Sequence, residues 1–288
     1  MAGGTRIEFR IVDCGLRIKG ALMGRLGVAC GAVLILAACG GGGGSPVPTS
    51  PAPIPVADTC NSLVGTASTS GVSILNGAQC SPEGSSVVLL NLRDASGAAI
   101  GACTGTIVTP RVVLTAAHCL DEGVSIARVW LGSGPEIVAE SFALYPNYRF
   151  NTPGVYDVGV IFMDEDLPRA PVPVLLGRDG KVGETAILAG WGRDQNNSPA
   201  TLRAGSTTLS AVTAESLQTI FAPPSSSVCS GDSGGPILLS EGGTWTIGGI
   251  TSATSNSACN TGTNFFQAVR HPSVRAFILQ HVPDVRQR

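Results

Sequence analysis

Three residues lie in sequence contexts that suit nucleophilic catalysis. Ser233 stands inside the segment 231–236 (GDSGGP), His118 inside 115–119 (TAAHC), and Asp157 opens the apolar run DVGVI. A serine hydroxyl is a weak nucleophile near neutral pH, so it needs a base such as histidine to take its proton during attack. An aspartate beside that histidine would fix its tautomer and stabilise the imidazolium. The three residue types therefore predict acyl transfer, provided that the fold brings them together.

Other carboxylates and histidines fit these roles less well. The cluster 164–166 (DED) precedes Leu-Pro and is more simply a solvated turn, and 121–123 (DEG) is a loop. His271 stands beside a proline and His281 in a C-terminal segment of helical spacing, so both suit packing or surface positions. Asp157 is preferred because it precedes an alternating apolar strand.

The elements that must position these residues are short strands joined by turns. Apolar runs at 107–108 and 112–114 flank a turn at 109–111 (TPR), which predicts a hairpin whose second strand leads into the histidine. The chain contains 38 glycines, and only 13% of its residues are charged, which suits short strands better than long amphipathic helices. The part of the chain after residue 73 is long enough for one compact unit.

The three motifs resemble those of the trypsin and chymotrypsin family. Their chain order, His then Asp then Ser, is that of the family and differs from the orders in subtilisins and α/β-hydrolases. The resemblance covers residues 74 to 283 and includes 189–192 (AGWG) and a closing segment from His271 to Val282 with helical spacing. It implies an all-β fold of two six-stranded antiparallel Greek-key barrels with a short C-terminal helix, and serine endopeptidase activity.

The same resemblance implies a role for each residue of the site. His118 would be the general base, Asp157 its orienting partner and Ser233 the nucleophile. The backbone N–H groups of Gly231 and Ser233 would form the oxyanion hole, where losing one donor typically costs about 2.7 to 4 kcal/mol of barrier.

A specificity pocket is also implied. Ser227, six residues before the nucleophile, would form its floor where trypsin-like members have an aspartate. An uncharged floor offers no ion pair to Lys or Arg, so cleavage after apolar or small residues is expected. Ser252 and Thr254 would line a wall, with Thr254 narrowing the pocket toward small residues.

The cysteines fall into two groups. Three lie in or before an N-terminal apolar segment, and the remaining six are Cys60, Cys80, Cys103, Cys119, Cys229 and Cys259. An even number without metal-ligand spacing predicts three disulfides in an oxidising compartment, but the residues alone leave their pairing open. The family resemblance implies the pairs Cys103–Cys119 and Cys229–Cys259, which leaves Cys60 and Cys80 for each other.

An activation step is implied by a segment between Cys60 and Cys80. Ile74 begins the tetrapeptide ILNG, which is similar to the IVGG that begins mature family members. By this resemblance, cleavage after Ser73 would free an ammonium on Ile74 that pairs with Asp232 and orders the oxyanion hole. Ser73 stands where the family usually has Arg or Lys, so self-activation by a tryptic cut is in doubt. The Cys60–Cys80 bridge would hold the cut segment to the enzyme or, alternatively, only staple a terminal loop.

The N-terminal region predicts an export signal. Basic residues precede the apolar run 26–38, which is too short to span a bilayer comfortably. The run ends in LAACG, which resembles the lipobox of bacterial lipoproteins and implies lipidation of Cys39. An ordinary cleaved signal is the alternative, and a start at Met23 would give a more compact one.

The expected organisation is a signal peptide at 1–38, a lipid-anchored Gly/Pro-rich linker at 39–58, a propeptide at 59–73 and a protease domain at 74–288. The protein would be an exported monomer held in the cell envelope, at the outer membrane or cell surface, with release from the cell as an alternative. Its partners would be protein or peptide substrates. A net charge of −2 argues against nucleic acid, and no metal or cofactor is expected. A binding protein or an esterase on the same fold stays open as an alternative function.

Overall fold

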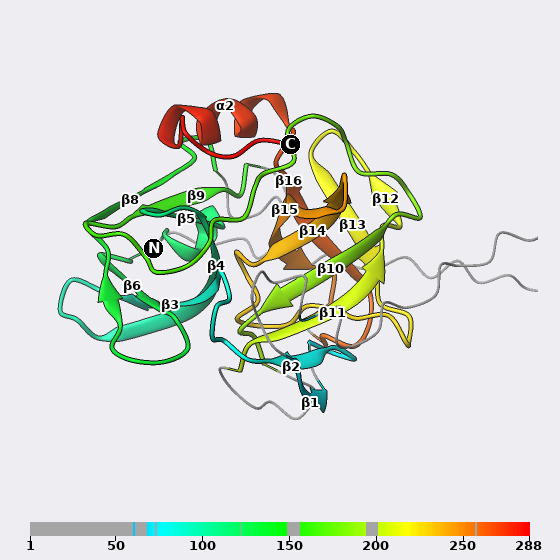
Figure 1. The fold of residues 1–288 in the computed structure, drawn as a ribbon, viewed down its shortest axis with the longest axis horizontal. Coiled ribbons are helices and arrows are strands. Elements are labelled where there is room, and N and C mark those ends of the chain that lie inside the picture. The colour runs from blue at the N-terminus through cyan, green and yellow to red at the C-terminus, as the bar shows by residue number, and fades with distance from the viewer. Residues whose placement is uncertain are drawn as a thin grey trace, which may run out of the picture. The chain divides into compact units, whose positions relative to one another are not determined.

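The computed structural model describes residues 60, 68–72, 74–121, 123–148, 156–193, 201–256 and 258–288. The predicted signal at 1–38, the linker at 39–58 and the lipidation site Cys39 lie outside this part of the chain, as does most of the segment 59–73. The described residues form two curled antiparallel sheets and few helical turns, as Figure 1 shows. None of their helices is long and apolar enough to cross a membrane.

The first sheet has seven strands in the order β7-β6-β3-β4-β5-β9-β8. In chain order these are β3 (Val87–Arg93), β4 (Ala99–Thr109), β5 (Val112–Thr115), β6 (Ile126–Trp130), β7 (Ile137–Val138), β8 (Ser141–Leu144) and β9 (Gly159–Phe162). The hairpin expected around Pro110 is β4–β5, in which Thr109 pairs with Val112. Strand β5 then pairs with β9, which is distant in sequence.

The second sheet has nine strands in the order β1-β2-β11-β10-β14-β15-β16-β13-β12. They are β1 (Ser68–Val72), β2 (Ala78–Cys80), β10 (Thr185–Gly190), β11 (Arg203–Thr208), β12 (Ala211–Val212), β13 (Ser216–Ile220), β14 (Pro236–Glu241), β15 (Thr244–Thr254) and β16 (Thr263–Ala268). Gly242 and Gly243 both have positive φ, so they form the type of two-residue turn that matches strand twist between β14 and β15.

The predicted all-β fold with a short C-terminal helix is confirmed. The strand numbers, seven and nine, exceed the six per barrel that the resemblance implied. The additional strands are short: β7 and β12 have two residues each, and β1 and β2 extend an edge of the second sheet. Such short edge strands carry little hydrophobic periodicity, so the sequence gives no clear sign of them.

The interior of each sheet is filled by aliphatic side chains. Leu90, Ile107 and Leu114 are at most 1% exposed in the first sheet, as are Ile187 and Leu188 in the second. Burying one such side chain contributes roughly 1.5 to 3 kcal/mol relative to exposure. The strands that carry the site are therefore held by the best-packed part of the molecule.

Helix α2 (Pro272–His281) follows β16 and packs against the other sheet. Pro272 suits the first helical turn, and the His271 side chain accepts a hydrogen bond from the Ser273 N–H. Phe277 is buried and its ring lies 5.6 Å from that of Tyr145, just after β8. The helical spacing predicted for this segment is confirmed, and His271 has a capping position.

Candidate active site

The histidine and the aspartate are brought together by strand register. Because Thr115 of β5 pairs with Gly159 of β9, the end of one strand lies beside the start of the other. His118 lies in the 3₁₀ helix η1 (Ala117–Cys119) just after β5, and Asp157 lies just before β9. His118 Nδ1 is 2.8 Å from Asp157 Oδ2, and the His118 backbone N–H donates to Asp157 Oδ1 at 3.0 Å.

The second sheet supplies a further donor to this carboxylate. Ser252 of β15 donates its hydroxyl to Asp157 Oδ2 at 2.6 Å. Asp157 is only 2% exposed, so its charge is stabilised by three protein donors in place of water. An ionised carboxylate only accepts hydrogen bonds, so His118 must carry its proton on Nδ1, which leaves Nε2 as the acceptor.

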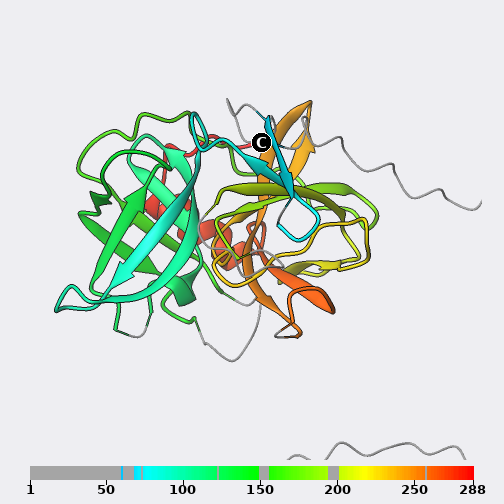
Figure 2. The same cartoon turned by 90° about the horizontal axis from the view of Figure 1, so that it is seen from below.

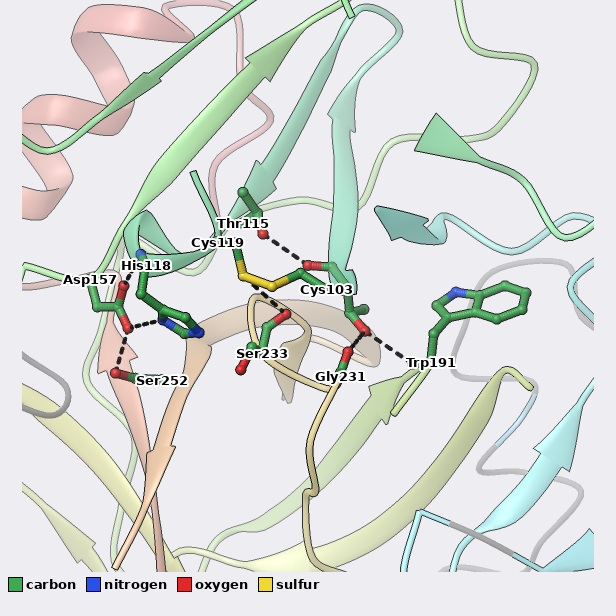
Figure 3. Close-up of a disulfide and its surroundings, with 10 residues drawn as sticks. Cys103, Thr115, His118, Cys119, Asp157, Trp191, Gly231, Ser233 and Ser252 are labelled. Atoms are coloured by element: carbon green, nitrogen blue, oxygen red, sulfur yellow. Dashed lines mark hydrogen bonds and ion pairs between the residues drawn. A yellow bond between two sulfur atoms is a disulfide. The ribbon is translucent and has the colours of Figure 1, made fainter. Parts of the chain in front are cut away.

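Ser233 lies in the turn that enters β14, beside the His118 ring and on the side away from Asp157, as Figure 3 shows. The turn is fastened to the first sheet by Thr104 of β4. The Thr104 N–H donates to the Ser233 carbonyl at 2.8 Å, and Thr104 Oγ1 donates to the Gly231 carbonyl at 2.8 Å. The same hydroxyl accepts from the Trp191 N–H at 3.0 Å. Among the described residues no hydrogen bond joins Ser233 Oγ to His118, and such bonds commonly tighten only with substrate bound.

Two N–H groups of the same turn differ from their neighbours in having no hydrogen-bond partner within the described part of the chain. The N–H groups of Asp232, Gly234 and Gly235 donate to backbone carbonyls at 2.8 to 3.0 Å. Those of Gly231 and Ser233 make no hydrogen bond to any residue that the structure describes. Gly231 has a φ of 96°, a conformation that favours glycine and that sets its N–H apart from those of its neighbours.

Asp232 is buried directly behind the turn. Its carboxylate accepts the N–H groups of Gly192 and Cys229, both at 2.8 Å. Burial raises the pKa of Asp232 to about 6, opposed by these two hydrogen bonds and by the positive charge of Arg203. Arg203 lies within the second sheet on β11 and donates to the Gly192 carbonyl at 3.0 Å.

Ile74 is 1% exposed and packs in the core of the second sheet. The next residue, Leu75, forms an antiparallel bridge with Ser227, and the Ser227 N–H donates to the Leu75 carbonyl at 3.2 Å. Asn76 has a φ of 59° and donates its side-chain amide to the Ser225 carbonyl. The segment that follows Ser73 is thus docked beside the segment 225–227, which precedes the turn that carries Ser233, and Ser73 itself lies outside the described residues.

The six downstream cysteines are joined as Cys60–Cys80, Cys103–Cys119 and Cys229–Cys259. The second bridge links β4 to η1 and lies against the site (Figure 3). In the described part of the chain, Cys103, His118 and Cys119 lie close enough together to suggest a metal site. Both sulfurs are used in the disulfide, so they are not available as metal ligands. Three disulfides fit an oxidising, extracytoplasmic compartment.

A cavity of about 220 Å³ opens beside Ser233. Its lining is uncharged and consists of Val228, Cys229, Ser230, Ser233, Thr251, Ser252, Ala253, Thr254 and Cys259. Ser252 and Thr254, both predicted to line a pocket wall, are part of it, whereas Ser227 is not.

Ser227 is instead fully buried in a polar network. Its hydroxyl donates to Asn264 Oδ1 at 3.0 Å, and Asn264 Nδ2 donates to Thr219 Oγ1 at 2.9 Å. Asn264 pairs with Thr254 across β15 and β16, so its side chain lies on the same face as that cavity-lining residue. Sequence reasoning missed Asn264 and Thr219, because no local motif marks them.

A second cavity, of about 230 Å³, lies on the other flank of His118. Its lining is mixed: Leu92, Ile100, Ala102, Val124 and the Cys103–Cys119 bridge are apolar, and Asp121 and His118 are polar. Ile100 is 46% exposed, which is unusual for a large aliphatic side chain in this chain. His118 and the disulfide thus line this second cavity, whereas Ser233 lines the first.

Comparison with known proteins gives consistent matches. The Trypsin family model matches residues 74–278. Chymotrypsin-2 of Vespa crabro is 30% identical over 158 residues, which cover 47% of this chain and 72% of that protein. Chymotrypsin-C of Bos taurus is 30% identical over 188 residues, covering 55% and 70%. Among solved structures, HL collagenase superposes with a TM-score of 0.61 at 21% identity, covering 73% of this chain and 98% of that one.

Proposed function

The chain belongs to the trypsin family and is a serine endopeptidase, and we propose that Ser233, His118 and Asp157 are its catalytic triad. The observation that carries this proposal is the His118–Asp157 pair, whose 2.8 Å bond leaves the histidine Nε2 as an acceptor on the side of Ser233. The relatives named chymotrypsin do not favour a binding protein or an esterase on the same fold.

The mechanism follows from these positions. His118 Nε2 takes the proton of Ser233 Oγ as that oxygen attacks the peptide carbonyl carbon, and Asp157 stabilises the imidazolium that forms. The negative oxygen of the tetrahedral intermediate is bound by the N–H groups of Gly231 and Ser233, which have no acceptor among the residues that the structure describes. His118 then returns the proton to the leaving amine, and water hydrolyses the acyl-enzyme by the same steps.

A fluorophosphonate probe tests the triad directly, because it phosphonylates only an activated serine. Protein that has been cleaved before Ile74 should be labelled, and Ser233→Ala should abolish both labelling and peptide hydrolysis. Ser225→Ala, a matched change in the segment that leads to the turn, should leave both intact. Equal labelling of wild type and Ser233→Ala would refute the assignment.

The cavity beside Ser233 supports a preference for small, uncharged residues on the acyl side of the cleaved bond. Its lining carries no charge, and the Ser227–Asn264–Thr219 network occupies the space next to Thr254. A long or cationic side chain would therefore have to displace buried, hydrogen-bonded groups, at a cost of about 1 to 3 kcal/mol per group left unpaired.

Peptide substrates that differ only at this residue test the preference. We expect the highest kcat/KM for Ala or Val, a lower value for Phe and the lowest for Arg. A preference for Arg or Phe would show that the network moves aside and that the pocket is deep.

Two further parts of the proposal rest on sequence. We propose that the chain is exported and held in the cell envelope by lipid on Cys39. We also propose that cleavage before Ile74 frees an ammonium that pairs with Asp232. The burial of both residues supports this, since Ile74 and Asp232 are each 1% exposed and an ion pair there would be shielded from water.

A further inference from the structure

Besides its carboxylate contacts, Asp157 is held by its backbone. Its N–H donates to Gln267 Oε1 at 2.9 Å, across 110 residues of sequence. Gln267 lies on β16 in the second sheet and is 0% exposed. The bond therefore joins the two sheets at the residue that pairs with the histidine.

The Gln267 amide is fixed in orientation by its other bonds. Its Nε2 donates to the carbonyls of Glu215 at 3.0 Å and Ala268 at 3.1 Å. A flipped amide would place NH₂ against the Asp157 N–H and the oxygen against two carbonyls, so every contact would be repulsive. The acceptor for Asp157 is thus preorganised, and it is shielded from water because Gln267 is fully buried.

The residue before the aspartate adds a second restraint. Tyr156 has a φ of 58°, which typically costs about 1 to 3 kcal/mol for a residue other than glycine. The Val158 N–H donates to the Tyr156 carbonyl at 2.9 Å, so Asp157 is the centre of a tight turn. The Tyr156 ring stacks on Tyr145 at 4.8 Å and meets His271 edge-on at 5.2 Å, and these contacts offset the backbone strain.

We propose that Gln267 and Tyr156 are positioning residues for the catalytic aspartate: they fix the turn around Asp157 so that its Oδ2 faces His118 Nδ1. This inference rests on the proposed triad. Neither residue touches the reacting atoms, and both act through the Asp157 backbone. A carboxylate set by side-chain contacts alone would keep rotational freedom about its own backbone, whereas this backbone is clamped from β16 on one side and from the Tyr145 stack on the other.

The first test is Gln267→Met, which keeps the side-chain length but removes the acceptor. We expect kcat to fall by about ten- to a hundred-fold, the range in which misplacement of a catalytic group typically lies, with KM unchanged. The low-field proton NMR resonance of the His118 Nδ1–H, which reports the hydrogen bond to Asp157, should weaken or shift upfield. Gln218→Met on β13 is the matched control, because the Gln218 amide donates to Ser216 Oγ and not to Asp157. It should change neither readout.

Tyr156→Gly removes the ring contacts on the other side of Asp157. Glycine tolerates the positive φ at this position, so this variant should fold and provides a second test if Gln267→Met does not fold. It should lower kcat and weaken the NMR resonance, with KM unchanged. Wild-type kcat and an unshifted resonance in the folded variants would overturn the inference. The resonance can be read without turnover, so failure of peptide hydrolysis in the wild type would refute the proposed function and still leave the positioning role to be judged.

Discussion

At the scale of single residues, Asp232 is unusual because its surroundings are mostly backbone. A methyl group added at Gly190 or Gly192 would overlap its carboxylate, so both positions require glycine. Two N–H groups and the charge of Arg203 then partly compensate the loss of water. Desolvation still dominates, which is why the pKa is raised to about 6.

The raised pKa of Asp232 predicts a specific pH dependence of stability. The pKa of Asp232 is about 6 in the folded chain and 3.8 in the unfolded chain, so the folded chain binds this proton more tightly. The proton therefore stabilises the fold fully below pH 3.8, and this contribution is lost as the pH rises through 6. In the uncleaved chain, the free energy of unfolding relative to that of Asp232→Asn should therefore fall by about 2 to 3 kcal/mol between pH 4 and pH 8. Urea unfolding of both proteins across this range measures the difference.

Asp284→Asn is the control for that experiment, because Asp284 is exposed and should give parallel curves. If the wild type and Asp232→Asn showed the same pH dependence of stability, this account of Asp232 would be contradicted.

At the scale of elements, the turn before β14 is defined by its closeness to β4 and β5. Gly234 has a φ of 81°, and a methyl group there would overlap Thr115 Oγ1 and the Thr104 carbonyl. Its N–H donates to the Thr251 carbonyl of β15 at 2.8 Å. Glycine at 234 thus allows one turn to contact both sheets, which is how Ser233 comes to lie beside a histidine from the other sheet.

Gly234→Ala separates this close approach from backbone strain. Gly97 has nearly the same φ, 84°, but nothing within 4 Å of an added methyl group. Gly97→Ala should therefore cost only the left-handed conformation, about 1 kcal/mol, whereas Gly234→Ala should cost more than about 3 kcal/mol because overpacking is added. Denaturant midpoints of the two variants give the comparison. Similar losses would mean that the turn can shift away from β4 and β5.

At the scale of the whole molecule, the two sheets lie side by side (Figure 2), and residues from both contribute to the site. His118 and Asp157 come from the first sheet, and Ser233, Ser252 and Gln267 come from the second. The sheets must therefore keep a fixed relation for catalysis. Thr104, the Asp157–Gln267 bond and helix α2 each cross between them and hold that relation.

The Cys60–Cys80 bridge predicts how an activated molecule behaves as a whole. If cleavage occurs before Ile74, the bridge keeps the upstream segment attached to the enzyme. Active protein should then run as one band without reductant and release a smaller fragment with it, and sequencing of the larger piece should begin at Ile74. Cys60→Ser should free the enzyme from its upstream segment after cleavage. A single intact chain that is fully active would show instead that the bridge only staples the terminal loop.

Much of the active centre could be predicted from sequence, because its chemistry is carried by side-chain types in local motifs. Ser233, His118 and Asp157 were singled out by their neighbours in the chain, and the all-β class followed from glycine content and short apolar runs. These signals are local, since a nucleophile turn or a strand end is specified within a few residues.

The residues that hold the site were decided only by tertiary structure. Thr104 contacts a turn 127 residues away, Gln267 contacts Asp157 across 110 residues, and Asn264 meets Ser227 across 37. Each of these side chains is unremarkable where it stands in the sequence, and strand register alone brings it to its partner. Ser227 illustrates the same limit: its spacing from Ser233 predicts a pocket floor, whereas its hydrogen bond to Asn264 is visible only in the tertiary structure. The sequence by itself determined which groups we propose for the chemistry, while sheet packing decided how they are oriented, because contacts between distant strands leave no periodic signal along the chain.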